Sequence, residues 1–68
     1  MNEETLNLSL RSFLKRVGIN CQREIEMGVR QALEDGKLQG DETLPVKVTL
    51  EFGPLDAPFV IEGEISLE

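Results

Sequence analysis

The last 26 residues, 43–68, constrain the fold of this chain more than any other stretch. Large apolar side chains there fall on alternate positions in two runs: Leu44, Val46, Val48, Leu50 and Phe52, then Phe59, Ile61, Ile65 and Leu67. Successive side chains of a β-strand point to opposite faces, so each run predicts a strand with one apolar face. We predict strands over residues 43–52 and 59–67, which a loop containing Pro54 and Pro58 joins into an antiparallel hairpin.

Two stretches upstream carry apolar residues at helical spacing. The first contains Leu6, Leu10, Phe13, Leu14 and Val17, and the second contains Ile25, Gly28, Val29, Ala32 and Leu33. The asparagine before each stretch, Asn2 or Asn20, can cap a helix N-terminus. Each stretch is followed by a glycine, Gly18 after the first and Gly36 after the second, and glycine adopts the left-handed conformation that ends many helices. We therefore predict helices over residues 3–17 and 21–35.

These elements predict one α+β domain with the order α-α-β-β, in which the helix pair packs on one face of the hairpin. The expected core consists of Leu10, Phe13, Leu14, Val17, Ile25, Val29, Leu33, Val46, Val48, Leu50, Ile61 and Ile65. A domain of 68 residues is marginally stable, and so is a lone two-stranded sheet. We therefore expect a protein partner or self-association as a homodimer. The second strand is the better pairing edge, because Pro45 in the first strand has no N–H to donate.

Most of the residue types that build catalytic or metal sites are missing. The chain has no histidine and one cysteine, Cys21, which excludes an internal disulfide and a structural zinc site within one chain. It also contains no glycine-rich phosphate loop and no serine, histidine and aspartate set. We expect no enzyme activity, no catalytic residue, no metal ion and no cofactor.

The apolar runs are also too short to form a membrane helix, which needs about 18 apolar residues. Glu3 and Glu4 place acids where a secretory signal has positive charge. Together with the single cysteine, these features predict a cytoplasmic protein that does not contact membranes.

The net charge of −6 lies entirely in the region of the predicted hairpin. Residues 1–40 contain six basic and six acidic residues, whereas residues 41–68 contain one basic and seven acidic residues. An acidic balance argues against nucleic acid as a partner. We predict a small non-catalytic module for protein–protein interaction or for structure. Its candidate interaction surface consists of Arg11, Lys15, Arg23, Leu55, Val60, Glu62 and Glu64.

Two alternative functions remain open at this point. Two helices joined at Gly18 have the outline of a helix-turn-helix, in which Gln22 and Arg23 would read base edges. Glu62 and Glu64 share one face of a predicted strand, so a second alternative is binding of a cation or small ligand there. An exposed acidic face also discourages edge-to-edge aggregation of strands, which requires no ligand.

Short segments along nearly the whole chain are similar to those of one known family. They are Met1-Asn2-Glu3-Glu4, Leu10, Phe13-Leu14-Lys15, Val17-Gly18, Gln22-Arg23-Glu24-Ile25-Glu26, Gly36-Lys37-Leu38, Gly40, Leu44-Pro45 and Gly63-Glu64-Ile65. With these segments the chain resembles a small family of uncharacterised bacterial proteins, a domain of unknown function. None of the segments is a catalytic signature, so the resemblance implies no activity, ligand or site.

Overall fold

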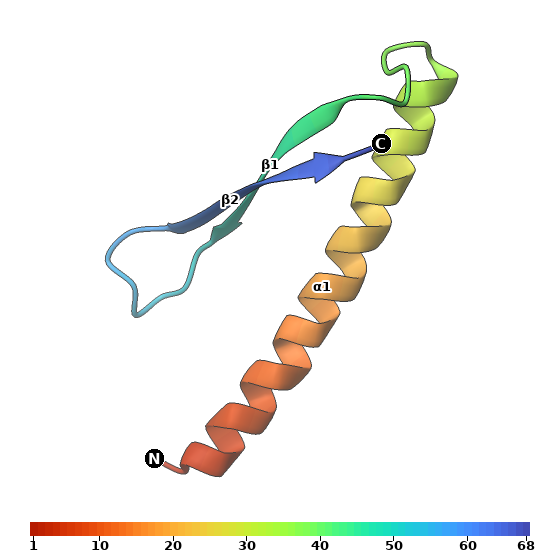
Figure 1. Cartoon of the computed structure of the whole chain (residues 1–68). Coiled ribbons are helices and arrows are strands. Elements are labelled where there is room, and N and C mark those ends of the chain that lie inside the picture. Colours follow the sequence, from red (N-terminus) through yellow and green to blue (C-terminus); the bar gives the residue numbers. More distant parts are fainter. The chain divides into compact units, whose positions relative to one another are not determined.

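The computed structural model describes residues 1–68. Figure 1 shows helix α1 (Glu3–Glu34), followed by strand β1 (Thr43–Leu50) and strand β2 (Phe59–Ser66). The predicted α+β class and the antiparallel hairpin are confirmed. The residues group into two compact units, Met1–Lys37 with the helix and Leu38–Glu68 with the hairpin.

The predicted helix pair is wrong, because residues 3–34 form one continuous helix. Asn20, the expected cap of a second helix, instead donates from Nδ2 to the carbonyl oxygen of Arg16 at 2.8 Å, within the helix. Gly18 does not adopt the left-handed conformation, since only Gly36 and Gly40 have a positive φ. The helix-turn-helix outline needs a break at Gly18 and is therefore wrong as well.

The helix continues through Gly18 because the two apolar stretches are in phase. Val17, Cys21 and Ile25 follow one another at intervals of four residues, which keeps them on one face of a helix. A glycine inside a helix costs about 1 kcal/mol relative to alanine. That cost does not break the helix, because residues 3–34 contain no proline and the many other residues of this long helix offset it.

Both ends of α1 are capped, and here the sequence-based prediction is confirmed. The Thr5 amide donates to Asn2 Oδ1 at 3.1 Å, which satisfies one of the free N–H groups of the first turn. At the other end Gly36 has a φ of 77°, and the Lys37 amide donates to the carbonyl oxygen of Ala32 at 2.9 Å. This is the Schellman arrangement, in which a left-handed glycine reverses the chain and satisfies a late carbonyl of the helix.

In the second unit, β1 and β2 pair in one register, from Thr43 opposite Ser66 to Leu50 opposite Phe59. Residues that lie opposite each other point to the same side of a sheet. The apolar hairpin face therefore consists of Leu44, Val46, Val48, Leu50, Phe59, Ile61, Gly63 and Ile65. The charged hairpin face consists of Thr43, Pro45, Lys47, Thr49, Val60, Glu62, Glu64 and Ser66. The register runs through Gly63 without a bulge, and the alternation seen in the sequence is confirmed.

The strands end slightly earlier than the predicted positions 52 and 67. After Leu50 the chain leaves the sheet, and the Leu55 amide donates to the carbonyl oxygen of Phe52 at 2.9 Å, which closes a turn around Gly53 and Pro54. Beyond the end of β2, the Leu67 amide donates to the Glu42 carbonyl oxygen at 2.9 Å. This bond extends the backbone pairing by one step past Ser66.

Neither unit buries a side chain by itself, so no core forms within the helix or within the hairpin. Phe13 on α1 is 46% exposed and Ile61 on β2 is 58% exposed, although both were expected inside. The half-buried apolar residues of α1 are Val17, Cys21, Ile25, Val29 and Ala32. The physical reason is that no second helix exists to cover the stripe of α1, and two strands alone bury neither face of a sheet.

Candidate interaction surfaces

The helix carries one apolar stripe along its whole length. This helix stripe consists of Leu6, Leu10, Leu14, Val17, Cys21, Ile25, Gly28 and Ala32. Its N-terminal half is the more exposed part, since Leu14 is 59% exposed while Val17 is half-buried. Most of the stability of helices in proteins comes from packing an apolar face of this kind against another surface. The helix stripe is therefore a surface that gains stability when another apolar surface covers it.

The predicted basic residues of α1 are only partly brought together. Arg11 and Lys15 lie one turn apart on neighbouring positions of the helix surface. Arg23 lies eight residues beyond Lys15, which places it about 80° further round the helix. Arg16 was not in the predicted surface, and its guanidinium carbon lies 5.7 Å from the centroid of the Phe13 ring, a cation–π contact.

The apolar hairpin face is the second exposed apolar surface. Phe59 and Ile61 on β2 are more than half exposed, and Val48 and Leu50 on β1 are 39% and 41% exposed. Cross-strand apolar pairs such as Val48 with Ile61 stabilise the hairpin itself. They leave the outer surface of the same side chains in water, so this face also gains stability when it is covered.

The charged hairpin face brings together three of the predicted residues, Val60, Glu62 and Glu64. Lys47 lies directly opposite Glu62, so a basic side chain is placed among the acids. A shallow depression of about 510 Å³ crosses the strands here, lined by Pro45, Val46, Lys47, Glu62, Gly63 and Glu64. No group of three or more side chains in the chain is placed to hold a metal ion.

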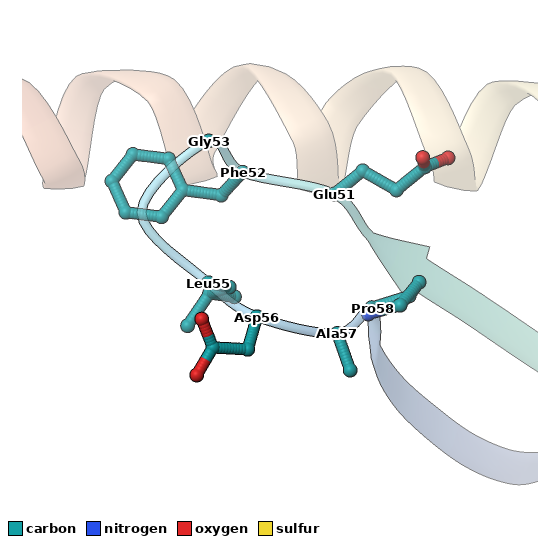
Figure 2. Close-up of a pocket in the computed structure, with 7 residues that line it drawn as sticks. All are labelled: Glu51, Phe52, Gly53, Leu55, Asp56, Ala57 and Pro58. Carbon is teal, nitrogen blue, oxygen red and sulfur yellow. The ribbon is translucent and has the colours of Figure 1, made fainter.

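Leu55, the remaining predicted residue, lies in the hairpin loop and is 43% exposed. The loop surrounds a depression of about 440 Å³, lined by Glu51, Phe52, Gly53, Leu55, Asp56, Ala57 and Pro58. Figure 2 shows that the carboxylates of Glu51 and Asp56 are directed away from the space that the loop encloses. The two acids thus do not converge on a common point, which a ligand held by both carboxylates would require.

Glu42 is a carboxylate that accepts backbone hydrogen bonds, and the sequence-based analysis did not single it out. Its Oε2 accepts a hydrogen bond from the Gln39 amide at 2.8 Å, and its Oε1 accepts one from the Gly40 amide at 2.9 Å. These backbone hydrogen bonds, from Gln39 first and Gly40 second, hold the pKa of Glu42 below its ordinary value. The side chain therefore fixes the turn between α1 and β1, and Gly40, with a φ of 106°, was the available signal for that turn.

Cys21 is a free, half-buried cysteine and a member of the helix stripe. It lies near the middle of α1, because the helix starts at Glu3 and ends at Glu34. In the sequence-based analysis Cys21 was not counted as apolar. Counting it would have joined the two predicted stripes into one and revealed the continuous helix.

No helix of this chain combines the length and the apolar character that crossing a membrane requires. The chain matches no curated protein and no solved structure. A family model described as "Family of unknown function (DUF6494)" matches residues 1–68, which is the whole chain. The match agrees with the resemblance to a domain of unknown function, and the chain belongs to the DUF6494 family.

Proposed function

We propose that this protein is a small non-catalytic module that acts by association with protein. The observation that carries the proposal is that neither the helix stripe nor the apolar hairpin face contains a residue that its own unit buries. Large exposed apolar patches on protein surfaces mark sites of interaction. Association with a protein would cover these two surfaces and remove them from contact with water.

Three polar side chains form hydrogen bonds with backbone groups, which supports a structural role for them. The carboxylate of Glu42, whose pKa is lowered, is held by backbone amides of its own turn. Asn2 and Asn20 both bond to the backbone of α1. These side chains stabilise local structure, and none of them is paired with a second titratable group as a general acid or base would be.

The charge of the chain favours protein over nucleic acid as the partner. The net charge is −6, and the charged hairpin face carries Glu62 and Glu64 against Lys47. The negative electrostatic potential of these acidic groups repels the phosphate backbone of nucleic acid. We place the module in the cytoplasm, because a free half-buried thiol such as Cys21 persists best in a reducing compartment.

The proposal is tested by the mass and the unfolding behaviour of the purified chain at two well-separated concentrations. One chain has a mass of 7.6 kDa. Light scattering is expected to give a larger mass at the higher concentration, and circular dichroism is expected to show more stable helix there, because association and ordering are linked. A monomer of 7.6 kDa at both concentrations that unfolds in one cooperative transition would overturn the proposal. Its apolar surfaces would then be covered within the chain.

A further inference from the structure

Each strand of the hairpin has one free edge, because the sheet consists of β1 and β2 alone (Figure 1). The hydrogen bond from the Leu67 amide to the Glu42 carbonyl oxygen continues the register of the two strands and fixes the direction of their backbone groups. In an antiparallel pair, residues that bond to the partner strand alternate with residues whose N–H and C=O groups point away from it. The residues of the apolar hairpin face therefore bond across the hairpin. The residues of the charged hairpin face direct their backbone groups to the two free edges.

The free edge of β2 is complete, whereas that of β1 is interrupted. On β2 the outward backbone groups belong to Val60, Glu62, Glu64 and Ser66, and each of these residues has an N–H to donate. On β1 an outward position is occupied by Pro45, so a donor is missing from that edge. β2 thus offers an unbroken row of donors and acceptors at the spacing that the backbone of another extended strand matches.

We propose that the free edge of β2 binds an extended segment of a different protein, which adds to the hairpin as a third strand and carries basic side chains at two alternate positions. This inference rests on the proposed function and names the kind of partner that the hairpin fits. Backbone hydrogen bonds hold an added strand of this kind, and the alternate side chains determine which segment is accepted. The side chains of β2 therefore define the sequence pattern of the partner.

The charge required of the partner follows from Glu62 and Glu64. Residues of the added strand that bond to the outward groups of β2 lie directly opposite these glutamates, with their side chains on the charged hairpin face. Opposite charges on facing residues of neighbouring strands stabilise the pairing, and like charges destabilise it. Within the hairpin, the basic Lys47 already lies opposite Glu62 on the β1 side. Two basic residues that are two positions apart in the partner therefore fit the other side of β2.

The residue between these two basic positions, and the residues that flank them, are expected to be apolar. They fall on the other side of the enlarged sheet, next to Ile61, Gly63 and Ile65 of the apolar hairpin face. Ile61 is 58% exposed, so a neighbouring apolar side chain would remove part of its surface from water. The partner segment thus alternates basic and apolar residues, as a strand with one charged and one apolar face does.

The same glutamates make a second copy of this chain an unsuitable partner for the edge. When two β2 strands pair antiparallel about Gly63, Glu62 of one copy lies opposite Glu64 of the other, and the symmetry repeats this contact. β1 of a second copy carries Lys47, but with Lys47 opposite Glu62 its Pro45 lies opposite Glu64 and has no N–H to donate. Charged side chains on an edge strand hinder pairing between like copies, and the same charges favour a basic strand.

Strand addition is tested with the full chain and a synthetic peptide as long as β2 in which lysine alternates with valine. Hydrogen exchange is expected to slow at the outward amides of Val60, Glu62 and Glu64, while the amides of Lys47 and Thr49 on the β1 edge exchange as before. Slower exchange at the β1 edge, or at neither edge when the peptide binds, would overturn the inference. A peptide with glutamate in place of lysine is the matched control and is expected to bind at least about tenfold more weakly.

Proline substitutions separate strand pairing from general attraction between a basic peptide and an acidic chain. Val60→Pro removes an outward N–H from the edge of β2, and Thr49→Pro removes the one opposite it from the edge of β1. Val60→Pro is expected to weaken peptide binding about tenfold, and Thr49→Pro is expected to leave it unchanged within about twofold. Neither N–H bonds across the hairpin, so both variants should keep the pairing of β1 and β2, as their chemical shifts would show. Equal affinities of the two variants would overturn the inference.

The charge of the edge is tested by combining Glu62→Gln with Glu64→Gln. The double variant is expected to bind the lysine peptide about tenfold more weakly. Glu3→Gln combined with Glu4→Gln is the matched control, because it changes the net charge equally at the first turn of α1, away from the hairpin in sequence. Equal loss of affinity in the two double variants would show that the peptide responds to net charge alone, which would overturn the inference.

The mass of the chain distinguishes this inference from the proposed function. If the mass rises with concentration but the chain binds no lysine peptide, the inference fails and the proposed function stands. If Val60→Pro abolishes the rise in mass and Thr49→Pro does not, a second copy occupies the edge of β2, which also overturns the inference. A cooperative monomer that binds no peptide would overturn both.

Discussion

Gly63 lies directly opposite Val46 on the apolar hairpin face, and a Cβ at position 63 would lie 3.8 Å from Val46 Cγ1. This is an ordinary van der Waals distance, and Gly63 does not have a positive φ, so alanine fits the strand without strain. Glycine gives the unfolded chain more conformational freedom than alanine does. Gly63→Ala is therefore expected to stabilise the hairpin by about 0.4–1 kcal/mol, measured from thermal unfolding followed by NMR chemical shifts of β2.

Gly40→Ala is the matched control for that substitution. Gly40 has a φ of 106°, a conformation that residues with a Cβ rarely adopt, although the space around it is open. Alanine is expected to destabilise the turn by at least about 1 kcal/mol. A loss of stability in Gly63→Ala, or a gain in Gly40→Ala, would contradict the backbone conformations described above.

The turn that precedes β1 is expected to loosen in acid. The folded-state pKa of Glu42 lies below its ordinary value of 4.5, because the Gln39 and Gly40 amides favour the charged carboxylate. A group with a lowered pKa stabilises the folded state above the ordinary value and loses that contribution as the pH falls through the lowered one. The amide chemical shifts of Gln39 and Gly40 are expected to titrate together with a midpoint below 4.5.

Glu42→Gln is the companion variant for this titration. The amide side chain keeps one accepting oxygen but loses the charge, so the two backbone amides are expected to exchange faster with solvent at neutral pH. The acid transition at Gln39 and Gly40 should disappear in this variant. A transition that persists would assign the titration to another carboxylate, and Asp41 is the nearest one in sequence.

Gly18→Ala is expected to strengthen α1. A Cβ at position 18 meets no atom within 4 Å, and the residue has helical neighbours on both sides. The substitution should add up to about 1 kcal/mol to helix stability, seen as greater helicity by circular dichroism at raised temperature. Gly36→Ala should have the opposite effect, because Gly36 ends the helix with a φ of 77°. Destabilisation by Gly18→Ala would indicate a break in the helix there.

Loss of the N-cap is expected to fray the first turn of α1. Asn2→Ala removes the acceptor for the Thr5 amide and should cost about 1 kcal/mol. Hydrogen exchange at Thr5 is expected to become faster, while exchange beyond the middle of α1 stays unchanged. Asn2→Asp keeps an accepting oxygen at the same place and should protect Thr5 at least as well. Equal exchange in all three proteins would show that the cap contributes nothing.

The parts of the fold that depend on local chemistry could be predicted from the sequence. Alternation of apolar residues gave the correct faces of β1 and β2, and Asn2 and Gly36 marked the correct ends of the helical region. Gly18 misled the prediction because glycine is compatible with both a helix end and a helix interior, and the choice depends on whether the stripe stays in phase across it.

The predicted core is absent within each of the two units for a different reason. Apolar residues at positions such as Phe13 and Ile61 were taken as buried within one chain, but burial needs an opposing surface, and periodicity does not reveal where that surface comes from. Of the candidate surface, the register of the strands brought Val60, Glu62 and Glu64 together as expected. The two hydrogen bonds that hold Glu42 depend on the conformation of a loop, which no pattern of residue types specifies.

The Schellman turn at Gly36 and the loop between Leu50 and Phe59 keep the backbone pairing of this chain local in sequence, which favours fast ordering of the backbone. All the backbone pairing lies within one helix or between two strands joined by a short loop, so little loop-closure entropy opposes it. Helices order in about 0.1–1 μs and hairpins in about 1–10 μs, whereas assembly of subunits takes milliseconds or longer. The backbone of the helix and of the hairpin is therefore expected to order far faster than any step that brings two protein chains together.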